Sequence, residues 1–273
     1  EASVQYYLKE QLDTITFEIL DANDNLIDTF TGSKPKYKVD KNIPWWQRGG
    51  SSKPTTAKGM NTFTWDLRYP GATDFEGMII WSARPTRGPK APIGNYKVKI
   101  KSGDYEKTYP FAIHMNPNLK GITKEDLDEQ FELANNIMQK TSAANEAVIH
   151  IREIKKQLKE HESRLSSSTM KRTISPFLSK ISVIEENLYQ VKNQSGQDPL
   201  NFPIKLNNRL ASLRRSMENG DAKPTDGAYK VFQELSAELE TELNNLNAIL
   251  KKEGAKVNKA LQDIGAENIK TAK

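Results

Sequence analysis

The sequence predicts a β-then-α protein, in which an antiparallel β-sandwich is followed by an elongated antiparallel bundle of three to four helices. Between Val4 and about Ile113, apolar residues come in short runs separated by glycine, proline, asparagine and aspartate, which is typical of strands and turns. Beyond Asn116 and Pro117 they recur every three or four positions, the period of a helix. The chain has 273 residues, enough for two ordinary domains, which we place at residues 1–116 and 117–273.

The first half begins with a predicted hairpin. Apolar and polar residues alternate from Thr14 to Leu20, residues 22–25 tolerate turn geometry, and the strand pattern returns from Leu26 to Phe30. Further strands are expected at residues 62–65, 78–81, 96–100 and 105–113. About seven short strands in this length favour two antiparallel sheets packed face to face, with a barrel as the alternative.

The second half begins with a helix start at Thr123, where Asp126 three residues on completes a capping box. An apolar stripe then runs from Leu127 to Leu158. One such stripe cannot offset the entropy of ordering a lone helix, so these helices must pack on one another. Three more helices are expected at residues 177–191, 206–217 and 232–264, joined by loops short enough for antiparallel neighbours.

Composition excludes several classes of protein. No apolar run approaches the roughly 18 residues of a membrane span, and the chain contains no cysteine for disulfides or thiolate metal sites. The net charge of +5 suggests nucleic acid, but the basic residues alternate with acids, as from Arg152 to Lys156. That pattern indicates a solvated helix face, so we predict no nucleic-acid partner. The first residue is Glu1, and we expect any export signal to lie before it.

Histidine is the usual general base near neutral pH, and the chain has three: His114, His150 and His161. None has a cysteine or an acid beside it at metal-ligand spacing, and the last two are eleven positions apart on one helix. Zinc-binding pairs on a helix lie about four apart. We therefore predict structural or solvent-facing histidines, with no metal or cofactor.

Glycoside hydrolysis needs two carboxyl groups across a sugar-binding cleft. The candidates for such a pair are the carboxylates that follow Trp65: Asp66, Asp74 and Glu76. A turn-capping role for Asp66 and a flexible, hydrated segment for the other two explain them more simply. Neither a phosphate-binding loop nor a Gly-x-Ser-x-Gly elbow occurs. The sequence therefore predicts no catalytic residue.

The tryptophans divide into two groups. Trp65 and Trp81 fall inside strand patterns and are expected in the core. Trp45 and Trp46 lie in a long polar loop, where an exposed pair would form a contact surface for a glycan or a protein. Together with Tyr69 they are the candidate ligand or partner contacts.

Three stretches together resemble a known family: residues 61–72 (NTFTWDLRYPGA), 88–98 (GPKAPIGNYKV) and 200–210 (LNFPIKLNNRL). The set resembles the C-terminal region of large bacterial β-propeller proteins labelled BNR-repeat glycosyl hydrolases or sortilin-like proteins. The first half is also similar to the immunoglobulin-like domain of flagellar hook-capping proteins, in which a Trp-Asp strand end precedes a Pro-x-Gly-x-Tyr strand start. Here Pro92 ends pairing and Tyr96 begins an alternating strand.

The resemblance implies a function and a partner. The blades of such propellers carry Ser-x-Asp-x-Gly-x-Thr-Trp repeats, and none occurs in this chain. Any glycosidase activity would then belong to the propeller, and this chain would be a non-catalytic accessory region of an exported, periplasmic or cell-surface bacterial protein. Its expected partner is the N-terminal propeller of the same polypeptide, with a carbohydrate or another protein as further partners. The alternatives are a carbohydrate-binding module that uses Trp45 and Trp46, and a glycoside hydrolase in its own right.

Overall fold

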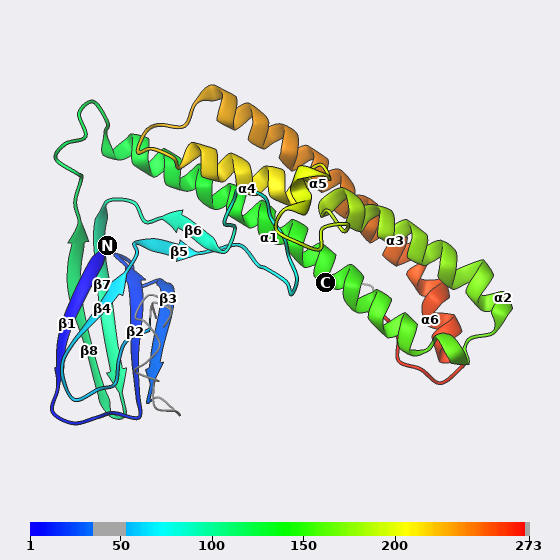
Figure 1. Ribbon diagram of the computed structural model, residues 1–273, viewed down its shortest axis with the longest axis horizontal. Helices are drawn as coiled ribbons and strands as arrows, with labels where there is room; N and C mark the ends of the chain where they lie inside the picture. The colour runs from blue at the N-terminus through cyan, green and yellow to red at the C-terminus, as the bar shows by residue number, and fades with distance from the viewer. Residues whose placement is uncertain (35–52, 271–273) are drawn as a thin grey trace. The chain divides into compact units, whose positions relative to one another are not determined.

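The computed structural model describes residues 1–34 and 53–270, and it places antiparallel β-sheets in the N-terminal half and helices after them (Figure 1). The chain forms two compact units. Unit 1 comprises Glu1–Pro70 and Gly88–Phe131, and unit 2 comprises Gly71–Arg87 and Glu132–Lys273. Residues 71–87 therefore group with the helices although they lie within the expected β half, and residues 117–131 group with the strands.

Unit 1 contains a two-stranded sheet and a four-stranded sheet, in which all the strand pairs are antiparallel. The two-stranded sheet joins β1 (Ala2–Leu8) to β4 (Gly59–Trp65). The four-stranded sheet has the order β3 (Leu26–Ser33), β2 (Thr14–Asp21), β7 (Gly94–Ser102), β8 (Tyr105–Ile113). A short ribbon pairs β5 (Arg68–Pro70) with β6 (Arg87–Lys90).

The predicted hairpin is confirmed as β2 and β3. Its turn is held by the carboxylate of Asp21, which accepts hydrogen bonds from the backbone N–H groups of Asn23 at 2.8 Å and Asn25 at 2.9 Å. Asp24 takes the left-handed conformation, with φ of 65°, which aspartate tolerates better than most residues. The turn residues therefore set the register of the hairpin.

One apolar core is shared by the strands of both sheets in unit 1, and Trp65 lies in it with 1% of its surface exposed. The Trp65 ring packs 5.8 Å from the Tyr96 ring, and its indole N–H donates to the carbonyl of Arg68 at 3.0 Å. A buried tryptophan N–H usually has a hydrogen-bond partner, because leaving it unpaired would offset part of the gain from burying the ring. The expectation of a core Trp65 is confirmed.

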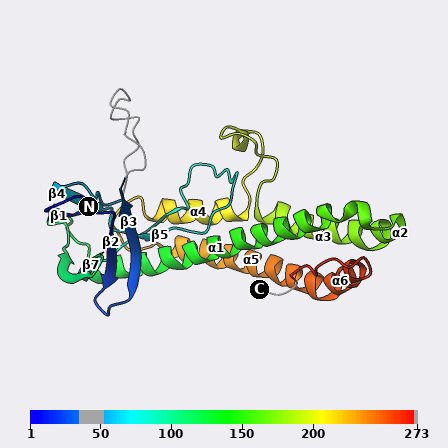
Figure 2. The same ribbon diagram turned by 90° about the horizontal axis from the view of Figure 1, so that it is seen from below.

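Within the described residues, four helices have twelve residues or more. The capping box predicted at Thr123 is present, since the Thr123 hydroxyl accepts from the N–H of Asp126 at 3.2 Å and the Asp126 carboxylate accepts from the N–H of Thr123 at 2.9 Å. Figure 2 shows α1, α3 and α5 running alongside one another, and their buried side chains form one apolar core. The helices are α1 (Lys124–Glu160), α2 (Ser167–Thr169), α3 (Ser175–Leu188), α4 (Leu206–Met217), α5 (Asp226–Lys252) and α6 (Gly254–Gln262).

We call residues 71–87 the strap. It contains no strand before Arg87, where β6 begins, so the strand predicted at residues 78–81 is wrong. Helix side chains take the place of a neighbouring strand. Asn208 on α4 accepts from the N–H of Trp81 at 2.7 Å and donates to its carbonyl at 3.0 Å. The hydroxyl of Tyr189 accepts from the N–H of Ile79 at 3.0 Å. The apolar run that resembles a strand is therefore an extended segment bound by polar side chains, and Trp81 is only half-buried.

The strap is held in two further places. Near its start, the side chain of Asn145 on α1 donates to the carbonyl of Thr73 at 2.6 Å. In its middle, the Phe75 ring meets the Tyr189 ring edge-on at 5.0 Å, and the Arg152 guanidinium lies 4.7 Å from the Phe75 centroid. Buried polar side chains of the helices thus have a structural role, which is to satisfy the backbone of the strap.

Candidate functional site

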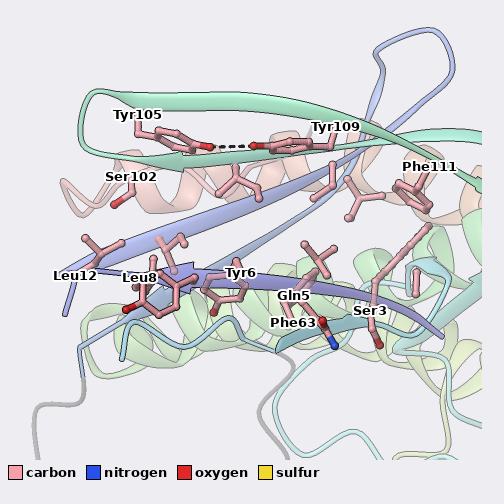
Figure 3. A pocket seen from close by; sticks show the side chains of 18 of the residues that line it. Ser3, Gln5, Tyr6, Leu8, Leu12, Phe63, Ser102, Tyr105, Tyr109 and Phe111 are labelled. Carbon is pink, nitrogen blue, oxygen red and sulfur yellow. Dashed lines mark hydrogen bonds between the residues drawn. The ribbon is translucent and has the colours of Figure 1, made fainter. Parts of the chain in front are cut away.

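Unit 1 contains a cleft of about 1120 Å³. One side is β1, from Ala2 to Leu8, and the other is β8 (Figure 3). Its floor consists of core side chains from β2, β4 and β7: Ile15, Ile19, Phe63, Trp65, Val98 and Ile100. The cleft therefore opens directly onto the apolar core of the unit.

Alternation along the two strands places apolar side chains in the cleft. On β1, Val4, Tyr6 and Leu8 are partly buried, whereas the residues between them are exposed. On β8, Tyr105 and Tyr109 line the cleft and remain 50% and 40% exposed. Side chains of this size are usually covered in a folded domain, so the β8 side of the cleft is an uncovered aromatic surface.

Two tyrosines on opposite sides of the cleft, Tyr105 and Tyr6, have raised pKa values. The hydroxyls of Tyr105 and Tyr109 lie 3.2 Å apart, and this hydrogen bond raises the pKa of Tyr105 above its ordinary value, with a further contribution from desolvation. On the opposite side, the Tyr6 hydroxyl donates to the carbonyl of Thr55 at 2.6 Å, and burial raises the pKa of Tyr6. The raised pKa values keep the phenols of Tyr6 and Tyr105 neutral in physiological conditions, so both can take part in hydrogen bonds without carrying a charge.

Charge is confined to one end of the cleft. Of the 22 residues that line it, Lys9 and Glu10 are the charged ones, and both follow the last residue of β1. The remaining lining is apolar, aromatic or neutral and polar. Such a surface binds an uncharged, largely apolar ligand by desolvation, with a few hydrogen bonds that fix its orientation.

The contact residues predicted from sequence lie elsewhere. Trp45 and Trp46 fall outside the described residues. Tyr69 is half-buried, its ring packs 4.7 Å from the Phe131 ring within unit 1, and burial raises its pKa. Sequence reasoning missed Tyr105 and Tyr109, although two tyrosines four positions apart, and so on one face of the last strand, were a usable signal.

The three carboxylates considered as glycosidase candidates do not line the cleft either. Asp66 is an exposed residue of unit 1, and Asp74 and Glu76 are exposed residues of the strap. None of the three belongs to the lining of the cleft. They give no support for paired acid–base chemistry there.

The histidines make ordinary contacts. His150 Nε2 lies 2.8 Å from the carbonyl oxygen of Lys270, His161 Nδ1 lies 3.5 Å from the guanidinium of Arg164, and His114 is exposed. Over residues 1–34 and 53–270, no group of three or more histidine, aspartate or glutamate side chains is arranged to hold a metal ion. In the same ranges, no helix combines the length and the apolar character that crossing a bilayer requires.

Known proteins provide no template for the cleft, because comparisons with family models, curated proteins and solved structures found no match. Its function is therefore argued from its own geometry and chemistry.

Proposed function

We propose that this chain is a non-catalytic interaction region of a larger exported β-propeller protein of the glycosyl-hydrolase-like class, and that the cleft between β1 and β8 is its binding surface. The observation that carries the proposal is a cleft of about 1120 Å³ that has exposed tyrosines on one side and charged lining residues, Lys9 and Glu10, at one end alone. Aromatic side chains are enriched in the centres of protein interfaces, where charged residues are depleted. The lining matches that composition.

The proposal includes a finer description of the fold. The β part is an immunoglobulin-like sandwich, supported by the single core that side chains of both sheets share. The helical part is an elongated antiparallel bundle of three to four helices, supported by the core common to α1, α3, α4 and α5. In this arrangement the sandwich supplies the binding surface and the bundle serves as a spacer or a partner-binding arm.

The expected partner is the N-terminal propeller of the same polypeptide, in the periplasm or at the cell surface of a bacterium. The resemblance of residues 61–72, 88–98 and 200–210 to propeller proteins supports this choice. The lining supports a protein partner over nucleic acid, because a nucleic-acid surface needs several lysine and arginine side chains to neutralise phosphates, and this lining has Lys9 beside Glu10 and no arginine.

The test is an association measurement with the propeller encoded before Glu1. The propeller is expressed separately and titrated with the full chain by calorimetry. We expect saturable binding that Tyr109→Lys weakens by about tenfold or more, because a charge would be desolvated in an apolar cleft. Thr108→Lys is the matched control, since Thr108 neighbours Tyr109 on β8 and does not line the cleft.

Two results would refute the proposal. One is the absence of association when both proteins are folded, as judged by circular dichroism. The other is a gene that encodes no propeller before Glu1, which would remove the basis of the resemblance.

A carbohydrate-binding role is the second candidate, and one described feature favours it. The neighbouring rings of Tyr105 and Tyr109 are 50% and 40% exposed and their hydroxyls bond to each other, while Lys107 Nζ lies 5.5 Å from the Tyr109 ring centroid. Exposed aromatic rings with polar groups beside them suit a sugar. A glycan array with the full chain tests this role. Binding that is lost in Tyr109→Lys and kept in Thr108→Lys would support it, and an array without signal would dismiss it.

A further inference from the structure

We infer that the cleft accepts an extended polypeptide segment with alternating apolar side chains, which adds to the free edge of β1 as a third strand of that sheet. This inference rests on the proposed interaction function and names the kind of partner and its binding mode.

The two strands that flank the cleft are both edge strands. Among the described strands, β1 pairs with β4 alone and β8 pairs with β7 alone. Each strand therefore presents one row of backbone N–H and C=O groups that no described strand pairs with. Figure 3 shows β1 on one side of the cleft and the β7–β8 hairpin on the other.

The two edges differ in their ability to pair. Pro110 lies in the middle of β8, opposite Lys97 of β7. Proline has no N–H, so it is tolerated where that group would point away from the neighbouring strand, and the free edge of β8 therefore lacks a donor at this point. In contrast, β1 contains neither proline nor a charged residue from Ala2 to Leu8. Proteins usually protect exposed strand edges with proline or charged residues. Because β1 has neither, its edge is the one that can form backbone hydrogen bonds with an added strand.

The side chains around the cleft set the pattern of the incoming strand. The two-stranded sheet has too few strands to cover the whole face of the four-stranded sheet with which it shares a core. Tyr105 and Tyr109 on β8 therefore remain exposed. A strand added beside β1 would lie over these rings. Because side chains alternate along a strand, every second residue of the added strand would face the cleft. Its length would match the seven residues of β1, roughly 23 Å at 3.3 Å per residue.

Charge and area decide between possible occupants. The lining is neutral except for Lys9 and Glu10 at one end, which argues against an anionic ligand. A second copy of the chain could pair β1 with β1, but an edge of about 23 Å by 10 Å buries far less than the roughly 1,200 Å² or more of a stable dimer. A peptide segment of another protein, or of a tethered domain, has no such requirement because it can insert its side chains into the cleft.

The first arm of the experiment identifies peptides that bind the full chain. A phage-displayed library of random peptides of about twelve residues is selected on the folded protein, and enriched sequences are synthesised. We expect apolar residues at alternate positions and no proline among them. The dissociation constant should rise by about tenfold or more in Tyr109→Lys, and in Tyr105→Lys as a second variant, but not in Thr108→Lys.

The second arm tests the binding mode by amide hydrogen exchange. If the peptide pairs with β1, then the outward N–H groups among residues 2–8 should exchange about tenfold or more slowly in the complex, whereas those of β8 should change little. Peptides that bind through Tyr109 without protecting β1 would refute strand addition and leave the proposed function standing. If no peptide of the library binds but the propeller does, then strand addition is refuted and the proposed function stands.

Two other outcomes would also overturn the inference. Glycan binding that is lost in Tyr109→Lys, without any peptide binding, would assign the cleft to carbohydrates. A concentration-dependent dimer in sedimentation that Tyr109→Lys abolishes would assign the edge to a second copy. Failure of both the peptides and the propeller to bind would remove the proposed function as well.

Discussion

Replacing Asn208 by alanine tests whether the helices hold the strap through its backbone. Asn208 is 4% exposed, and its amide pairs with both the N–H and the carbonyl of Trp81, at 2.7 and 3.0 Å. The two residues are 127 positions apart, so this contact closes a long loop onto α4. Asn208→Ala leaves both backbone groups of Trp81 without this partner.

The expected loss can be worked out from these two groups. A buried donor or acceptor left unpaired costs about 1–3 kcal/mol. Because Trp81 is half-buried and water can partly replace the amide, the lower part of that range applies to each group. We expect Asn208→Ala to lower the free energy of unfolding of the helical unit by about 2–3 kcal/mol, which increases local opening of the strap roughly 30- to 150-fold.

The assay combines urea unfolding, followed by helical circular dichroism, with hydrogen exchange at the Trp81 amide. The control is Arg209→Ala on the same helix, since Arg209 forms an exposed ion pair with Glu238 and should contribute less than about 1 kcal/mol. If Asn208→Ala unfolds at the wild-type urea concentration and Trp81 exchanges at the wild-type rate, then Asn208 does not hold the strap.

Three further predictions address other contacts. Glu185 is buried and binds two cations of α1, including Arg152 at 2.7 Å, so Glu185→Ala should lower the free energy of unfolding by about 1–3 kcal/mol in urea titrations; an unchanged midpoint would contradict this. Burial raises the pKa of Tyr96. The neutral Tyr96 side chain therefore contributes its full stabilisation at pH values below about 10, the pKa of tyrosine in the unfolded chain, and this contribution is lost as the pH rises through the higher pKa of the folded protein. Tyr96→Phe should flatten this alkaline loss in unfolding curves above about pH 10, and an equally steep loss would refute the assignment. A Cβ added at Gly88 would lie 1.9 Å from the carbonyl oxygen of Tyr69, so Gly88→Ala should cost about 3 kcal/mol or more, visible as a lower Tm, and a wild-type Tm would show that the backbone can shift.

Features of the fold that depend on neighbouring residues were predictable. The hairpin follows from the alternation of Thr14–Leu20 and from turn residues that satisfy their own backbone through Asp21. The start of α1 follows from Thr123 and Asp126, which cap each other three positions apart. In both cases the deciding contacts lie within a few residues, so the sequence displays them directly.

The strap and the cleft were not predictable in the same way. The run from Met78 to Trp81 has the composition of a strand, and nothing near it indicates that Tyr189 and Asn208 will take up its backbone hydrogen bonds. Likewise, the sequence around Tyr105 and Tyr109 is that of an ordinary strand and does not show whether the two side chains are covered. Their exposure depends on which strands cover them, and strand pairing joins residues such as Ala2 and Trp65 that are far apart in the chain.

The sequence alone therefore determined the β-then-α order and the type of most elements, the strand expected at residues 78–81 excepted, because helix and strand periods are set by local side-chain spacing. It also determined the absence of cysteine. Only the tertiary structure decided that residues 71–87 belong to the unit that contains the helices, and that β1 and β8 border a largely apolar cleft. The physical reason is that a backbone group or an apolar face is satisfied by whichever partner packs against it, and that partner is chosen by the whole fold.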